Sequence, residues 1–254
     1  MADALLQIED LAKRFEGVVA SDHIMLEVER GELHAVIGPN GAGKTTLIGQ
    51  LAGEVAPDSG RIRFDGGDIT ALPVHRRSQL GLARSFQISS LFTEFTALDN
   101  AALAVQAHAG HSFRFWRNAR AEHELREPAR AALDRVGLGA RADTLVSRLS
   151  HGEHRQLEIA MALATRPRML LLDEPMAGMG PEESARMVRL LRELKRELTI
   201  LLIEHDMEAV FALADRITVL VYGRVIASGR PAEIRANPEV REAYLGEQQV
   251  VAHG

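Results

Sequence analysis

The residues with the clearest capacity for chemistry lie at 38–46, where the chain reads Gly-Pro-Asn-Gly-Ala-Gly-Lys-Thr-Thr. Its three glycines let the backbone turn N–H groups inward around a phosphate, which residues with side chains could not do without strain. Lys44 adds a positive charge that can reach the β- and γ-phosphates of a nucleotide, and Thr45 offers a hydroxyl to Mg²⁺. The predicted phosphate-binding residues are Gly38, Pro39, Asn40, Gly41, Ala42, Gly43, Lys44, Thr45 and Thr46.

Two carboxylates follow the apolar run Met169–Leu172. Asp173 stands where a buried strand would emerge, so it is predicted to hold Mg²⁺ through water. Glu174 points to the opposite side and could polarise a water in line with a γ-phosphate. The alternative is that Pro175 merely ends a strand, but the phosphate loop upstream favours the catalytic interpretation.

Ser150 precedes a segment in which Leu157, Ala160, Met161 and Ala164 recur at helical spacing. Ser150 is therefore expected to be the N-cap of a helix. A helix N-terminus with a free hydroxyl and the unobstructed N–H of Gly152 is also an anion site. Because the phosphate loop of the same chain already serves one nucleotide, this second site is best used on the γ-phosphate of a partner.

The pattern around these residues predicts an α/β protein with a parallel sheet. Short apolar or alternating runs predict strands, and 95–166 shows no convincing strand, which indicates a helical insertion with Pro128 placed to start a helix. Helices are expected from Gly43–Lys44 through Leu51, from Pro181 to about Leu198 and from Asp206. The predicted strands are 6–9, 26–29, 33–37, 61–64, 169–172, 199–203 and 217–221.

The order of these motifs resembles that of ATP-binding-cassette (ABC) ATPases, from Leu6 to about Leu245. The resemblance implies a P-loop ABC-type nucleotide-binding domain: a RecA-like core with an antiparallel β portion (about 5–87 and 166–246) and a helical subdomain (about 88–165). ATP and Mg²⁺ are the implied cofactors. The tail 247–254 is expected to be disordered.

The same resemblance assigns further roles residue by residue. Phe15 matches the aromatic that stacks on adenine, and Gln87 matches the glutamine that touches Mg²⁺ and the attacking water. His205 matches the histidine that contacts the γ-phosphate, while Ser150 and Gly152 match the signature residues that contact a partner's γ-phosphate. Taken singly, Phe15 could be a core aromatic, Gln87 a surface amide and His205 a helix-start histidine.

Within the family the chain looks most like ATP-binding subunits of branched-chain amino acid importers of the LivG type. The residues that carry this likeness are 84–87, 178–181, 202–207 and 237–246. It implies an ATPase on the cytoplasmic face of the inner membrane. The implied partners are permease subunits, a second ATPase in a head-to-tail dimer and, indirectly, a solute-binding protein. A urea importer or lipopolysaccharide exporter is the alternative, and a soluble ABC ATPase acting on nucleic acid or ribosomes is more remote.

Three residues depart from the family pattern. The signature usually reads Ser-Gly-Gly-Gln, and here His151 and Glu153 replace its second and fourth residues. Glu153 is expected to bring a carboxylate near an anionic ligand. Gly180 stands where the family usually has an aspartate that bonds across the dimer.

Composition narrows the classes of partner. The 254 residues carry a net charge of -5, which gives no electrostatic footprint for nucleic acid. The absence of cysteine excludes disulfides and thiolate metal sites. The longest apolar runs fall far short of the ~20 residues that span a bilayer, and the N-terminus lacks a secretory signal pattern. Any membrane role is therefore expected to come through a partner.

Overall fold

The computed structural model describes residues 4–85, 91–108 and 123–243, and within them the strands form two sheets. The smaller sheet is antiparallel and has the order β2-β1-β4-β5. Its strands are β1 (Ala4–Phe15), β2 (Val18–Glu29), β4 (Ser59–Phe64) and β5 (Gly67–Asp68). The first two extend the predicted strands 6–9 and 26–29 into a long hairpin.

The larger sheet has the order β10-β9-β3-β8-β7-β6 and is parallel except for β10. Its strands are β3 (Leu33–Ile37), β6 (Leu82–Arg84), β7 (Met169–Asp173), β8 (Thr199–Ile203), β9 (Arg216–Val221) and β10 (Arg224–Gly229). Every residue of β3, β7 and β8 is buried, as expected for parallel strands covered on both faces. Parallel strands end at one edge of a sheet, so the segments after β3, β7 and β8 meet there.

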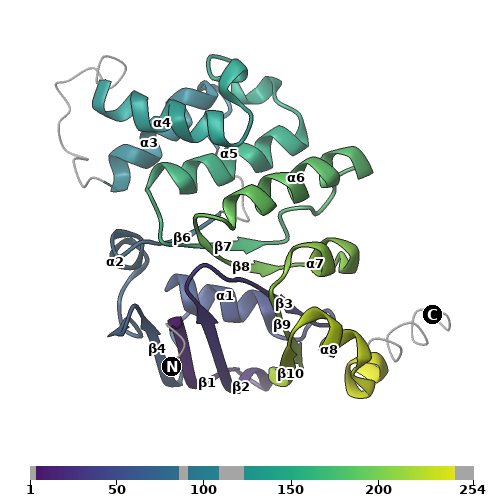
Figure 1. Ribbon diagram of the computed structural model, residues 1–254. Helices are drawn as coiled ribbons and strands as arrows, with labels where there is room; N and C mark the ends of the chain where they lie inside the picture. The colour runs from purple at the N-terminus through teal and green to yellow at the C-terminus, as the bar shows by residue number, and fades with distance from the viewer. Residues whose placement is uncertain (1–3, 86–90, 109–122, 244–254) are drawn as a thin grey trace.

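Helices cover both faces of the larger sheet (Figure 1). On one face, α1 (Lys44–Ala52) packs between the two sheets in an apolar cluster with residues of β1, β4 and β7. On the other, α3 (Ala97–His108), α4 (His123–Arg135), α5 (His151–Ala164) and α6 (Pro181–Leu194) share a second core. Near β9, α7 (Met207–Leu213) and α8 (Pro231–Ala236) form a third.

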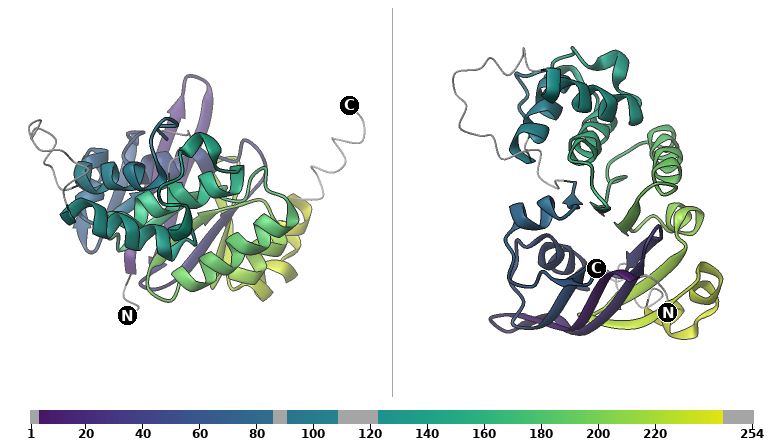
Figure 2. Two further views of the ribbon diagram at one scale, coloured as in Figure 1. Left: turned by 90° about the horizontal axis from the view of Figure 1, so that it is seen from above. Right: turned by 60° about the vertical axis from the view of Figure 1, so that its left-hand side comes forward.

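The group α3–α5 lies at one end of the molecule, and the β1–β2 hairpin lies towards the other (Figures 1 and 2). The described parts of 95–166 contain helices and no extended strand, as predicted, apart from one isolated bridge between Thr96 and Leu145. The short helix α2 (Val74–Gln79) lies beside β6 and also contacts α3.

Two helix boundaries differ from the prediction. Pro128 lies inside α4, which already begins at His123 in the described residues. A proline at this position cannot donate to the carbonyl oxygen of Glu124 one turn earlier, so that oxygen lacks its usual helical N–H donor. The helix that begins at Pro181 ends at Leu194 rather than near Leu198, because a short turn leads the chain into β8.

Candidate functional site

The phosphate loop runs from Gly38 to Gly43, between β3 and α1. Two of its glycines are required by close backbone approaches. A Cβ at Gly38 would lie 2.0 Å from the carbonyl oxygen of Leu220, and one at Gly43 would lie 2.1 Å from that of Ala20. Gly43 also has a φ of 101°, which side-chain-bearing residues rarely adopt. The neighbouring strands β9 and β2 therefore fix the shape of this loop.

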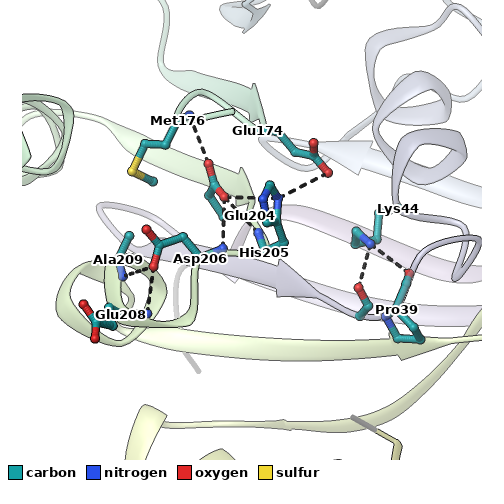
Figure 3. Close-up of polar contacts among 10 residues, drawn as sticks. Pro39, Lys44, Glu174, Met176, Glu204, His205, Asp206, Glu208 and Ala209 are labelled. Carbon is teal, nitrogen blue, oxygen red and sulfur yellow. Dashed lines mark hydrogen bonds and ion pairs between the residues drawn. The ribbon is translucent and has the colours of Figure 1, made fainter. Parts of the chain in front are cut away.

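Lys44 turns back over this loop (Figure 3). Its Nζ donates to the carbonyl oxygens of Gly38 at 2.6 Å and Pro39 at 2.9 Å. The N-cap of α1 is Gly43, which has no side chain to bond the first N–H groups of the helix. An ammonium group and a helix N-terminus thus lie together beside backbone that can surround a phosphate.

Asp173 is the last residue of β7 and is 4% exposed. Its Oδ2 accepts from Nη2 of Arg84 at 3.1 Å, whereas its Oδ1 is buried and has no hydrogen-bond partner among the described residues. Burial raises the pKa of the Asp173 carboxyl, and the positive charge of Arg84 opposes that rise. A buried carboxylate oxygen without a donor suits a cation, so this residue fits the magnesium role expected of it.

Glu174 follows at the strand end and adopts a left-handed backbone with a φ of 49°. Such a conformation is costly for a non-glycine residue and is found mainly where the surroundings enforce it, often at functional sites. Here its N–H donates to the carbonyl oxygen of Ile203 on β8 at 2.9 Å. This bond anchors Glu174 at the edge where β7 and β8 end.

His205 faces this glutamate from the end of β8 (Figure 3). Its Nδ1 lies 3.8 Å from Oε1 of Glu174 and 3.7 Å from Oε2 of Glu204. The imidazole is 64% exposed, whereas the Glu204 side chain is fully buried. An exposed imidazole and a partly exposed carboxylate therefore meet where the parallel strands end, a usual place for ligands in such sheets.

Phe15 lies at the tip of the β1–β2 hairpin and is 46% exposed. The core-aromatic alternative is therefore wrong. Lys13 Nζ lies 5.3 Å from its ring centroid. The same hairpin places Ala20 against Gly43, so the exposed ring belongs to the element that packs on the phosphate loop. Gln87 lies outside the described residues.

Ser150 is the N-cap of α5, as predicted. Its Oγ accepts from the N–H of Glu153 at 3.2 Å, and Oε2 of Glu153 accepts from the N–H of Ser150 at 2.8 Å. Glu153, one of the three departures from the family pattern, therefore closes a capping box. The spacing Ser-x-x-Glu is the sequence signal that could have revealed this role. Arg141 Nε lies 3.5 Å from the other carboxylate oxygen.

The remaining contacts of this segment join it to 174–180 and to α6. The Nε2–H of His151 donates to the carbonyl oxygen of Ala177 at 3.1 Å. A Cβ at Gly152 would lie 2.7 Å from Oε1 of Glu183, so this glycine gives the α6 carboxylate room. The signature segment thus lies against the loop that follows Glu174.

Arg84 joins the strand-end site to a groove. The groove has a volume of about 390 Å³ and is lined mainly by apolar side chains of α2, β6, α3 and α5. Glu54 and Arg84 form part of its wall, and Arg84 pairs with both Glu54 and Asp173. One guanidinium therefore touches the groove and the candidate magnesium ligand.

The sequence of the chain matches two models of known protein families. The model of the family described as "ABC transporter" matches residues 21–177, which is more than half of the chain. The chain belongs to this family. A second model, described as "Branched-chain amino acid ATP-binding cassette transporter", matches residues 224–250. As an ABC cassette, the chain is an ATP-hydrolysing subunit of a transporter.

Similar proteins and structures agree. The chain is 41% identical to the high-affinity branched-chain amino acid transport ATP-binding protein BraF of Pseudomonas aeruginosa, over 97% of this chain and 100% of BraF. It is 39% identical to LivG of Salmonella typhimurium, with the same coverage. The ADP conformation of MJ1267, an ATP-binding cassette of an ABC transporter, superposes with a TM-score of 0.86 at 32% identity, covering 96% of this chain and 99% of that one. The predicted fold class is therefore confirmed.

Within the described residues of this cassette, none of the helices combines the length and apolar character needed to cross a membrane. The sequence motifs led to the strand-end carboxylates and to His205. They did not lead to Arg84 or Glu204, whose contacts depend on which strands become neighbours. The structure thus adds two charged residues, Arg84 and Glu204, to the predicted site.

Proposed function

We propose that this cassette powers a membrane importer of branched-chain or other hydrophobic amino acids. The support is the near-complete coverage of BraF and LivG together with the separate C-terminal match over 224–250. That C-terminal match favours the amino-acid importer over the lipopolysaccharide-export and urea alternatives, because ATP hydrolysis itself does not need such a segment. Substrate choice would rest with the membrane subunits and an external solute-binding protein.

The observation that carries the chemistry is the meeting of three strand ends at one edge, after β3, β7 and β8. The loop from Gly38 to Thr46 would bind the ATP phosphates, and the exposed ring of Phe15 would stack on the adenine. Thr45, Gln87 and Asp173 would hold Mg²⁺, whose charge stabilises the negative oxygens of the transferring phosphoryl group. The buried, unpartnered Oδ1 of Asp173 supports this donor set.

Glu174 is the proposed general base. Its carboxylate would orient the attacking water and accept its proton, since at this edge Asp173 pairs with Arg84, Glu204 is buried and the Asp206 side chain caps α7. His205, 3.8 Å away, would hold the water and the γ-phosphate in line. Lys44 would leave the carbonyls of Gly38 and Pro39 and pair with the phosphates instead.

The proposed working form is a head-to-tail pair of cassettes. Each chain presents two helix N-termini suited to anions, α1 at its own phosphate loop and α5 at Ser150 and Gly152. The second of these would close on the ATP bound by a partner chain, either a copy or a related subunit. Glu153, engaged in the capping box, keeps one carboxylate oxygen turned towards the helix backbone.

A cytoplasmic segment of the permease, the membrane partner, is proposed to dock into the groove between α2, β6, α3 and α5. The groove is largely apolar, and through Arg84 it contacts the candidate magnesium ligand, so docking there would reach the chemistry directly. The core and the α3–α5 group would act as two lobes around it. The cassette would then sit on the cytoplasmic face of the inner membrane, without nucleic acid as a partner.

Reconstitution tests this assignment. The chain would be co-purified with candidate permease subunits of an amino-acid importer and placed in liposomes with the corresponding solute-binding protein. We expect ATP-dependent uptake of leucine, isoleucine or valine, and no stimulation of ATPase activity by urea. Stimulation by lipopolysaccharide-export components, without amino-acid uptake, would contradict the proposal.

A further inference from the structure

Glu204 has an unusual environment for a carboxylate. It is 1% exposed, and it lies between the end of β8 and His205. Among the described residues, neither an arginine nor a lysine forms an ion pair with it. Burying a carboxylate is expensive unless hydrogen bonds compensate for the lost water.

Three main-chain N–H groups supply that compensation (Figure 3). Oε2 of Glu204 accepts from the N–H of His205 at 2.8 Å and of Asp206 at 3.2 Å. Oε1 accepts from the N–H of Met176 at 3.0 Å. One oxygen therefore binds the segment that carries His205, and the other binds the segment that carries Glu174.

The Met176 segment is compact. The N–H of Ala177 donates to the carbonyl oxygen of Glu174 at 3.1 Å, and that of Met179 donates to the carbonyl oxygen of Met176 at 3.2 Å. Because these bonds close the loop on itself, a restraint at Met176 also restrains Glu174. On its other side, His151 holds the carbonyl oxygen of Ala177 at 3.1 Å.

We propose that Glu204 is a positioning residue, which fixes the 174–179 loop relative to His205. Through the contact of His151 with the same loop, it also connects the N-terminus of α5 to the Glu174–His205 pair. This inference rests on the proposed roles of Glu174 and His205. Gly180, at the end of the same loop, has no side chain to hold the loop, and the Glu204 and His151 contacts link the loop within one subunit. A role in stability alone would require a buried carboxylate at this position but not its hydrogen bond with the N–H of Met176.

Two substitutions separate these roles. In Glu204→Gln the amide oxygen can serve only one of the two segments, because the amide nitrogen would face N–H groups of the other. In Glu204→Asp the charge stays, but the side chain is one methylene shorter and cannot bond both segments. We expect each to lower kcat for ATP hydrolysis by about tenfold or more, with KM for ATP within about twofold, since small misplacements of reacting groups carry penalties of this order.

The matched control is Glu208→Gln, a similar change at an exposed glutamate of α7 four residues further on. It should leave kcat unchanged. Hydrogen exchange of the purified full-length chain gives a readout that does not depend on turnover. We expect faster exchange at the amides of Met176 and Ala177 in both Glu204 variants and unchanged exchange in the control.

His151→Ala completes the test. If both side chains act on one loop, His151→Ala should lower kcat in the native background and have little further effect beside Glu204→Gln. Native kcat in Glu204→Asp, or losses that multiply in the double variant, would overturn the positioning role. Glu174→Gln serves as the reference. If this variant hydrolyses ATP at the native rate, Glu174 is not the base. If Glu174→Gln is inactive but the Glu204 variants keep native activity, Glu174 remains the base and Glu204 is not a positioning residue.

Discussion

Nη2 of Arg84 lies 3.1 Å from Oδ2 of Asp173, and this pair joins the last residue of β6 to the last residue of β7. The two side chains are 11% and 1% exposed. Arg84 also binds Glu54 at the groove wall. Arg84 therefore compensates the charge of the buried Asp173 carboxylate and also forms part of the groove wall where a partner would dock.

Arg84→Gln should therefore destabilise the fold. Removing one member of a buried pair leaves the other charge uncompensated, which typically costs about 3 kcal/mol or somewhat more. Equilibrium denaturation at neutral pH measures this loss. Arg76→Gln is the control, because Arg76 is exposed on α2 and bonds only locally to Gln79 in the described contacts. Equal stabilities of the two variants would show that the Arg84 pair contributes nothing.

The capping box at α5 predicts contrasting effects at two neighbouring positions. Ser150→Ala removes the acceptor for the N–H of Glu153 and should cost about 1 kcal/mol. Glu153→Gln retains an oxygen for the N–H of Ser150, so stability should change by less than about 0.5 kcal/mol. Thermal denaturation of both variants provides the comparison. A larger loss for Glu153→Gln than for Ser150→Ala would argue against the capping role.

Asp65 offers a pH-dependent test of the contact between the two sheets. Hydrogen bonds from Arg168 at 2.6 Å and Arg30 at 2.8 Å lower the pKa of its carboxyl to about 2. A depressed native pKa stabilises the fold above the unfolded value of 3.8, and the effect fades as pH falls from there towards 2. Asp65→Asn should thus be less stable than the native chain at pH 6, and the difference should shrink on acidification. A pH-independent difference would contradict this linkage.

Gly43 tests how tightly the phosphate loop is built. Gly43→Ala would place a Cβ 2.1 Å from the carbonyl oxygen of Ala20, in a backbone conformation unsuited to alanine. We expect at least a hundredfold loss of ATP affinity, because the loop must move away from β2 and lose its phosphate geometry. Gly41→Ala is the control: it shares a positive φ but has open space around the added carbon. Similar affinities for both variants would exclude the contact with Ala20 as the cause.

Much of this site could be predicted from local sequence because its chemistry sits directly after buried strands. The apolar runs Leu33–Ile37 and Thr199–Ile203 predict such strands, and parallel strands deliver their C-terminal residues to one edge. The partners of Arg84 could not be predicted in this way. Asp173 lies 89 positions away, and the pairing depends on β6 becoming the neighbour of β7.

Glu204 illustrates a second limit. In the sequence it is simply a polar residue between an apolar strand and His205, and local pattern suggests an exposed side chain. Its burial follows from the backbone of 174–177 folding over the end of β8, where unpaired N–H groups need an acceptor. Glu153 differs, because the spacing Ser-x-x-Glu is local and did contain the information.

Single-turnover hydrolysis by Glu174→Gln, with ATP binding measured in parallel, tests whether Glu174 activates the attacking water. The amide has nearly the same shape but cannot accept a proton, so we predict unchanged ATP affinity, ATP-dependent dimers and a loss of hydrolysis of about a hundredfold or more. Hydrolysis at the native rate by this variant would show that another group performs the step.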